Sequence, residues 1–218
     1  MLLPSLARAK ETGKRISCLN NLRQLSLASQ VYVGDSQGIY PPRSQSSRWP
    51  NALYDSYGRT LKLLVCPSEL TNAPLGHLTG DGDTNMPDLT ARSYFINGWN
   101  DFFISGTDTS GLNLGDAMKE NQIIHTSDTF LFGEKSAQHT DYYMDLNEGM
   151  AGNDFDGILD QSAHSSTSSD HLQGTGSGGS NFAITDGSAL YIKFPTALAP
   201  INRWANSDAN RAAYAASY

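Results

Sequence analysis

The chain lacks the sequence features that identify most enzymes and membrane-spanning proteins. None of its 218 residues belongs to an apolar run of 18, so we expect no transmembrane helix in this sequence. The apolar start, Met1-Leu2-Leu3, is too short to be a signal peptide. Nucleophile-elbow, phosphate-loop and dinucleotide-binding motifs are missing, and the five histidines show no metal-ligand spacing. We therefore expect no catalytic residues and no enzymatic activity.

Charged residues are scarce, at 17% of the chain, and they are unevenly distributed. Residues 1–23 have a local net charge of +4, from Arg8, Lys10, Lys14, Arg15 and Arg23 against Glu11. The rest of the chain has a net charge of −11, which argues against nucleic acid as a partner. Three interpretations of the basic segment are open: a solvated helix face, a contact with anionic headgroups, or a contact with the acidic body of another copy.

Only two cysteines are present, Cys18 and Cys66, separated by 48 positions. The sequence leaves open whether they are two buried thiols or one disulfide. Neither has another Cys or a His at zinc-ligand spacing, so the sequence does not predict zinc. A disulfide would indicate an oxidising, exported setting and, by closing a loop of about 50 residues, would contribute roughly 3–4 kcal/mol to stability.

The clearest pattern is a helix over residues 5–35, because apolar residues recur there at spacings of three and four. Gly13 is a weak point, costing about 1 kcal/mol relative to Ala, and we expect it to separate an exposed stem from a part packed on a sheet. Gly38 and Pro41-Pro42 end the helix. The predicted buried stripe consists of Cys18, Leu22, Leu25, Ala28 and Tyr32, widened by Leu19 and Leu27.

Beyond this helix we expect a β-rich body over residues 37–218, with the helix itself, residues 1–36, as a separate unit. Residues 92–97 and 129–133 are predicted strands, and 181–185 and 189–194 a β-hairpin turning at Asp186-Gly187. We also expect a short helix and then an extended Leu63–Cys66 within 48–69, a short helix over 113–121, and a helix in the tail after Trp204.

One loop has the oxygen-rich spacing of a calcium site. Its candidate ligands are Asp81, Asp83, Asn85 and Asp88. The loop lacks the glycine and the acid that complete such a motif, since Met86 and Arg92 stand at those positions. The alternative is an Asx-rich surface loop, and otherwise no cofactor is expected.

Several segments together resemble the bacterial prepilin-type proteins named for an H-X9-DG element. The segments are Leu2–Lys10 (LLPSLARAK), Ser17–Gln24 (SCLNNLRQ), Cys66-Pro67-Ser68, Ser93–Gly98 (SYFING), Gly133–Ser136 (GEKS), and His171 followed by Asn181–Gly187 (NFAITDG). The last element departs from the family pattern, because 14 residues rather than nine separate His171 from Asp186. The resemblance spans nearly the whole chain.

The resemblance implies an exported protein of the cell surface or extracellular space, with a disulfide between Cys18 and Cys66. It implies an α+β, pilin-like fold, in which a long N-terminal helix lies across an antiparallel sheet with long variable loops. A prepilin also carries about 20 apolar residues before the position of Leu2, and only through such a segment would this protein enter a membrane.

Two functions follow as hypotheses. The first is a structural subunit of a pilus-like filament or pseudopilus, a homo-oligomer assembled through Leu2, Leu3 and Leu6. The second is an exported binding module whose loops, 81–88 and 136–180, recognise a glycan or another surface ligand. Five aromatic residues are either platforms for that ligand or core residues: Trp99, Phe102, Phe103, Tyr142 and Tyr143.

Overall fold

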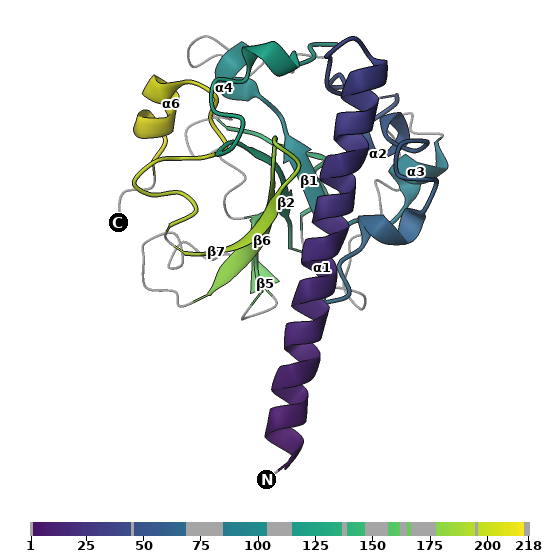
Figure 1. The fold of residues 1–218 in the computed structure, drawn as a ribbon, viewed down its shortest axis with the longest axis vertical. Helices are drawn as coiled ribbons and strands as arrows, with labels where there is room; N and C mark the ends of the chain where they lie inside the picture. The colour runs from purple at the N-terminus through teal and green to yellow at the C-terminus, as the bar shows by residue number, and fades with distance from the viewer. Residues whose placement is uncertain are drawn as a thin grey trace.

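The computed structural model describes residues 2–44, 46–68, 85–103, 115–136, 139–146, 157–161, 165–166, 178–194 and 196–215. A long helix and a five-stranded sheet dominate it (Figure 1). The helices are α1 (Leu2–Asp35), α2 (Trp49–Ala52), α3 (Met86–Leu89), α4 (Asn100–Phe103) and α6 (Asp208–Ala213), with 3-10 turns η1 (Leu61–Leu64) and η2 (Glu120–Gln122). The strands are β1 (Tyr94–Asn97), β2 (Phe130–Glu134), β3 (Tyr143–Met144), β4 (Leu159–Asp160), β5 (Ser165–Ser166), β6 (Gly179–Ile184) and β7 (Ala189–Lys193).

The main sheet is mixed, which corrects the expectation of an antiparallel one. Its strand order is β3-β1-β2-β6-β7, and only the β1–β3 pair is parallel. The reason lies in the connection. The last residue of β2, Glu134, lies opposite Tyr94, the first residue of β1. The chain therefore leaves β2 at the end of the sheet where β1 begins, and from there it reaches the side of β1 that β2 leaves open. It therefore enters β3 running in the direction of β1. The α+β class is confirmed, as are the β6–β7 hairpin and the strands at β1 and β2.

Helix α1 crosses one face of the sheet over β2, β6 and β7, and its N-terminal part projects beyond the body (Figure 1). Cys18, Leu22 and Leu25 are fully buried against the sheet, whereas Leu27, predicted to widen this stripe, is half exposed. The prediction for Leu27 was wrong because that residue lies well around the helix from Leu22, toward solvent. The change from exposed to buried also comes later than Gly13, at Cys18. Among the described residues, no helix combines the length and the apolar character needed to cross a bilayer.

The opposite face of the sheet is covered by an aromatic cluster and the C-terminal segment. Phe130 and Phe182 stack with ring centroids 4.2 Å apart, and Trp204 packs edge-on against Phe130 at 5.4 Å. The predicted tail helix is present as α6, whose N-cap Ser207 accepts a hydrogen bond from the backbone N–H of Asn210. The sheet is thus enclosed between α1 on one face and the Trp204 cluster on the other.

Two local predictions were wrong. The segment before Cys66 is not extended throughout, because Leu61–Leu64 forms the 3-10 turn η1 and buries Leu64. No helix covers the described part of 113–121 beyond η2, since Lys119 bridges to Ile39 and Met118 accepts a hydrogen bond from the Tyr40 N–H. Residues 118–119 thus pair with residues 39–40, just after α1. This pairing uses backbone N–H and C=O groups that would otherwise form the hydrogen bonds of a helix.

Trp204 packs so closely on the centre of β2 that Gly133 admits no side chain. A Cβ at Gly133 would lie 2.7 Å from an atom of the Trp204 ring. We expect Gly133→Ala to lower the free energy of unfolding by about 1–3 kcal/mol, measured by chemical denaturation. Gly13→Ala is the matched control, because a Cβ there meets nothing within 4 Å and should only increase helix content. Equal stability of the Gly133 variant and the wild type would contradict this packing.

Candidate functional site

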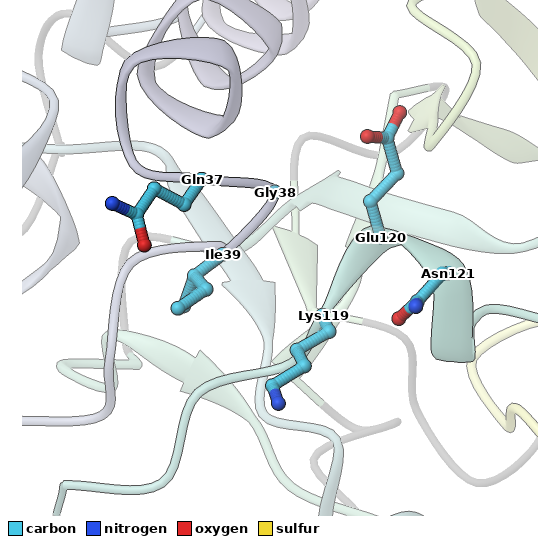
Figure 2. Close-up of a pocket in the computed structure, with 6 residues that line it drawn as sticks. All are labelled: Gln37, Gly38, Ile39, Lys119, Glu120 and Asn121. Atoms are coloured by element: carbon cyan, nitrogen blue, oxygen red, sulfur yellow. The ribbon is translucent and has the colours of Figure 1, made fainter.

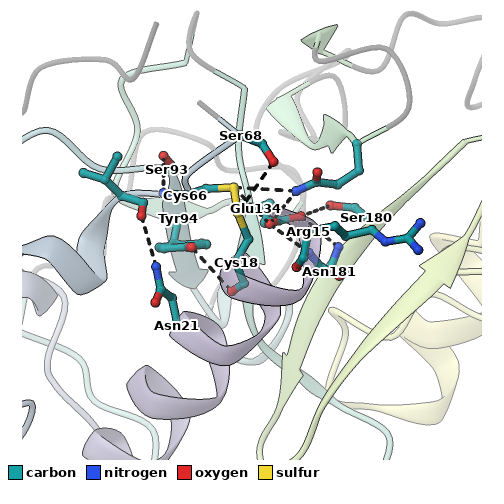
Figure 3. The surroundings of a disulfide bond; sticks show 12 residues. Arg15, Cys18, Asn21, Cys66, Ser68, Ser93, Tyr94, Glu134, Ser180 and Asn181 are labelled. Atoms are coloured by element: carbon teal, nitrogen blue, oxygen red, sulfur yellow. Dashed lines mark hydrogen bonds between the residues drawn. A yellow bond between two sulfur atoms is a disulfide. The ribbon is translucent and has the colours of Figure 1, made fainter. Parts of the chain in front are cut away.

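The candidate site is the joint that fastens α1 to the body, and a disulfide between Cys18 and Cys66 lies at its centre (Figure 3). Both cysteines are fully buried. Cys18 is on α1, and Cys66 follows η1, where its backbone N–H donates to Ser93 Oγ at 3.0 Å. The pairing that the family resemblance implied is therefore present in the structure. It ties the helix directly to the segment after η1, which is hydrogen-bonded to Ser93 beside β1.

A buried carboxylate, Glu134 at the end of β2, lies beside the disulfide (Figure 3). Its Oε1 accepts hydrogen bonds from Gln161 Nε2 at 2.7 Å and Asn181 Nδ2 at 3.0 Å. Its Oε2 accepts from the Asn181 N–H at 3.0 Å and from Ser180 Oγ at 3.4 Å. Burial raises the pKa of Glu134 to about 7, and the four donors oppose that rise by favouring the ionised form.

Sequence reasoning gave Glu134 no role beyond its place in a family segment. Its partners come from residue 161 and from β6, so their approach depends on how the sheet is assembled. One signal was available: an acid follows the apolar run Phe130–Phe132 and Gly133, in a strand whose five residues are all buried. A charged residue at the end of such a strand needs buried partners.

Further contacts extend the joint along α1 in both directions. The Arg15 guanidinium lies 4.6 Å from the centre of the Tyr191 ring, and Asn21 Nδ2 donates to the Val65 carbonyl at 3.1 Å. Near the other end of α1, Ser26 Oγ donates to the Ile184 carbonyl at 3.0 Å, beside the β6–β7 turn. The helix is thus held over roughly its C-terminal half.

The family element is divided between the described residues and those outside them. Asp186 and Gly187 form the β6–β7 turn, where Asp186 Oδ1 accepts from the Ser188 N–H at 2.8 Å. Gly187 has φ +92°, a conformation that favours glycine. His171 lies outside the described residues, so no contact between His171 and the turn can be stated.

The predicted assembly residues belong to the projecting part of α1. Leu2 and Leu3 are in the helix, although only its backbone is described there, and the Leu6 side chain is 68% exposed. Three further apolar side chains on α1 are about half exposed, namely Ile16, Leu27 and Val31. At 3.6 residues per turn these four residues fall within about 80° of each other, on the side opposite Cys18, Leu22 and Leu25. We call Leu6, Ile16, Leu27 and Val31 the outer stripe.

Of the four predicted calcium ligands, the structure describes Asn85 and Asp88. Asp81 and Asp83 lie outside the described residues. Asp88 is fully buried, and its two oxygens accept from the backbone N–H groups of Arg48 and Asn51, both at 3.0 Å. Asp88 therefore satisfies the start of α2, where N–H groups have no partner within the helix. Asn85 Nδ2 donates to the Ser46 carbonyl.

The aromatic residues considered as ligand platforms are mainly core residues. Trp99, Tyr142 and Tyr143 are buried, and Phe103 packs partly buried against the same core. Only Phe102 is exposed. The Tyr142 ring is flanked by two guanidiniums, those of Arg48 and Arg92, at 4.1 and 3.3 Å from its centre. Four of the five candidates are thus engaged in packing, namely Trp99, Phe103, Tyr142 and Tyr143.

A small hollow and a polar cluster are the other notable features of the described surface. The hollow, beyond the end of α1, is lined by Gln37, Gly38, Ile39, Lys119, Glu120 and Asn121 (Figure 2).

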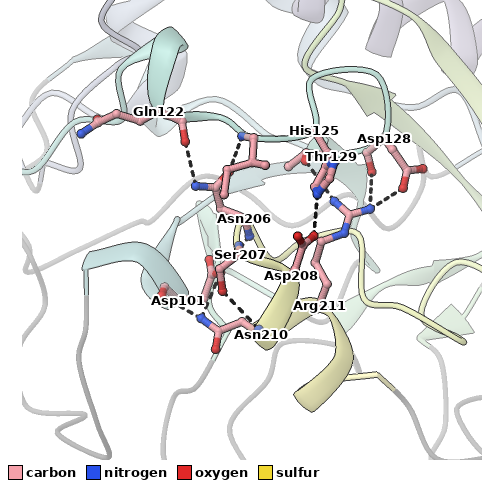
Figure 4. Close-up of polar contacts among 11 residues, drawn as sticks. Asp101, Gln122, His125, Asp128, Thr129, Asn206, Ser207, Asp208, Asn210 and Arg211 are labelled. Atoms are coloured by element: carbon pink, nitrogen blue, oxygen red, sulfur yellow. Dashed lines mark hydrogen bonds and ion pairs between the residues drawn. The ribbon is translucent and has the colours of Figure 1, made fainter.

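The polar cluster fixes α6 on the body (Figure 4). Asp101 Oδ2 accepts a hydrogen bond from the Asn206 N–H at 2.8 Å, and Arg211 pairs with Asp128. His125 Nε2 lies 2.6 Å from Asp208 Oδ1 in the same region. These contacts hold the C-terminal segment on the body.

Comparison with protein-family models, with curated proteins and with solved structures finds no match for this chain.

Glu134 should give the protein a measurable pH dependence of stability. Because its pKa rises from 4.5 to about 7 on folding, its contribution is full below pH 4.5 and is lost as the pH rises through 7. As the pH rises from 4.5 to 7, the free energy of unfolding of the wild type should fall relative to that of Glu134→Gln, by at most on the order of 3 kcal/mol. Denaturation across pH 4–8 measures this difference, with Glu120→Gln as an exposed control. A difference that does not vary with pH would refute the assignment.

The disulfide should stabilise the whole body, because its loop spans 48 positions and includes the attachment of α1. We expect Cys18→Ala/Cys66→Ala to lower the free energy of unfolding by roughly 3–4 kcal/mol. Chemical denaturation of the variant and of the oxidised wild type checks this. If the free energy of unfolding fell by less than about 1 kcal/mol, the noncovalent contacts of the joint would be enough to hold α1 on the body without the disulfide.

Proposed function

We propose that this protein is a pilin-like structural subunit of a filament or pseudopilus at the cell surface or outside the cell, and that it self-associates through α1. The observation that carries this proposal is the outer stripe. Apolar side chains line the side of α1 that faces away from its own body, and the helix continues beyond that body (Figure 1).

In an isolated monomer, the projecting part of α1 is an unsupported helix with an exposed apolar side chain. Residues 2–14 extend about 20 Å at 1.5 Å per residue, and a single helix of this length is only marginally stable in water. Leu6 is largely exposed there. Fully burying one Leu, Ile or Val contributes about 1.5–3 kcal/mol, so covering the outer stripe with another helix would stabilise both partners.

The two ends of the molecule also suit a head-to-tail assembly. A basic helix projects from an acidic body, since residues 1–23 have a net charge of +4 and the remainder −11. Contact between the stem of one copy and another surface of the next is heterologous. Repetition of such a contact gives a filament whenever its rotation does not close a ring.

The buried disulfide supports the proposed location. Disulfides form and persist in oxidising compartments, which the surface and the extracellular space provide. The proposal assigns the chain no catalytic role and no cofactor. Calcium binding stays a prediction, and comparing thermal unfolding with calcium and with a chelator tests it.

A binding module is the less favoured function. It would need aromatic platforms, and four of its five candidate residues are packed in the core. Of its two candidate loops, 81–88 contributes only residues from Asn85 onward to the described structure, and there Asp88 is used to hold α2.

Charges in the outer stripe should prevent assembly without unfolding the body. We expect Leu6→Glu and Ile16→Glu each to shift the protein from assemblies to monomers, because both side chains are already exposed in the monomer. Sedimentation velocity and negative-stain imaging measure the change. Ala7→Glu, on the stem but on the side opposite the stripe, is the matched control and should assemble normally.

Removing residues 1–14 should leave a folded, soluble monomer. Filaments that persist in this deletion, or in the Leu6 and Ile16 variants, would show that α1 is not the assembly element.

A further inference from the structure

The disulfide and Glu134 together form a group of three potential metal ligands. In the described part of the chain, Cys18, Cys66 and Glu134 each offer one ligand atom, and these atoms all lie within 4.8 Å of one another. All three residues are fully buried. They come from α1, from the segment after η1 and from the end of β2, so only the folded chain brings them together.

One of the spacings between these atoms already matches tetrahedral zinc. With Zn–S near 2.3 Å and Zn–O near 2.1 Å, a sulfur and an oxygen ligand are about 3.6 Å apart. Glu134 Oε1 lies 3.6 Å from Cys66 Sγ. Ser68 Oγ lies 3.8 Å from Cys18 Sγ, beside the same group of atoms (Figure 3). Two sulfur ligands would be about 3.8 Å apart, so the sulfurs need only separate once their bond is reduced.

The surroundings of Glu134 already resemble those of a metal-bound carboxylate. Gln161 Nε2 and Asn181 Nδ2 both donate to Oε1, and the Asn181 N–H holds Oε2. Such outer hydrogen bonds orient a ligand and are typical of metal sites.

We propose that the reduced chain binds one zinc ion between the Cys18 and Cys66 thiolates and the Glu134 carboxylate, and that this ion holds α1 on the body until the disulfide forms. Every copy begins with both thiols reduced, so the site exists before oxidation. Zinc binding displaces the two thiol protons and ties the same elements that the disulfide ties. Cysteine spacing in the sequence missed this site because its third ligand is a glutamate 68 positions beyond Cys66.

Conversion of the zinc form to the disulfide form is a two-electron oxidation. A disulfide-bearing oxidant supplies it by thiol–disulfide exchange. The S–S bond of the oxidant breaks, the Cys18–Cys66 bond forms, and the oxidant leaves as two thiols with two protons from solvent. Zn²⁺ is released, since neither sulfur remains a thiolate.

The test uses the full chain, reduced without oxygen by a phosphine, which offers no thiolate of its own. Titration with Co²⁺ should give thiolate-to-cobalt charge-transfer absorption at one ion per chain, and Zn²⁺ should abolish it by displacement. The disulfide form should bind neither ion. We also expect zinc to raise the unfolding temperature of the reduced chain.

Variants locate the ion. Cys18→Ser/Cys66→Ser should lose binding, and Glu134→Gln, which removes a direct ligand, should weaken it by at least about 100-fold, the upper end of what the loss of an outer-shell partner causes. Glu120→Gln, the same change at an exposed position, should bind as the wild type does. Circular dichroism of oxidised Glu134→Gln checks its fold. The proposal is overturned if the reduced wild type takes up no metal, or if either the cysteine or the Glu134 variant binds as tightly as the wild type.

Discussion

The attachment of α1 to the sheet between Arg15 and Ser26 is the constraint on which the rest of this structure depends. It buries Cys18, Leu22 and Leu25 against β6 and β2, and the disulfide and Glu134 hold it at the end where the helix leaves the body. Because that end is fixed, the direction in which the preceding turns project is fixed as well. The exposed stem therefore continues the axis of the buried helix.

This arrangement gives the two sides of α1 different tasks. The inner side supplies the core of its own chain, and the outer stripe has no apolar cover among the described residues. Glu134 is the least expected part of the joint, since a buried carboxylate is costly unless its oxygens are hydrogen-bonded. Four donors meet that need, and three of them come from Ser180 and Asn181 at the start of β6. The acid thereby couples β2 and β6 to the disulfide.

The sequence predicted the elements whose signals are local. Periodicity located α1, aromatic and β-branched residues located β1 and β2, and the Asp186-Gly187 turn located the β6–β7 hairpin. The family resemblance implied the Cys18–Cys66 pair. Local signals did not predict the parallel pairing of β3, which depends on the path of the chain after β2. They also misplaced Leu27, whose hydrophobicity was taken as a sign of burial in its own core.

The candidate site was harder to predict because its ligating and hydrogen-bonding groups converge only in three dimensions. Glu134, Gln161 and Asn181 are far apart along the chain, and no motif links them to either cysteine. In contrast, the spacing that predicts Asp88 as a calcium ligand is local, and the buried contacts of Asp88 with the start of α2 are visible only in the fold.

We propose that the buried half of α1 belongs to its own body and the projecting half packs on a neighbouring copy. Amide hydrogen exchange along α1, compared between monomer and assembled protein, tests this directly. We expect slow exchange for residues 19–33 in both states, and for residues 5–14 fast exchange in the monomer that becomes slow on assembly. Fast exchange of residues 5–14 in the assembled protein would contradict it.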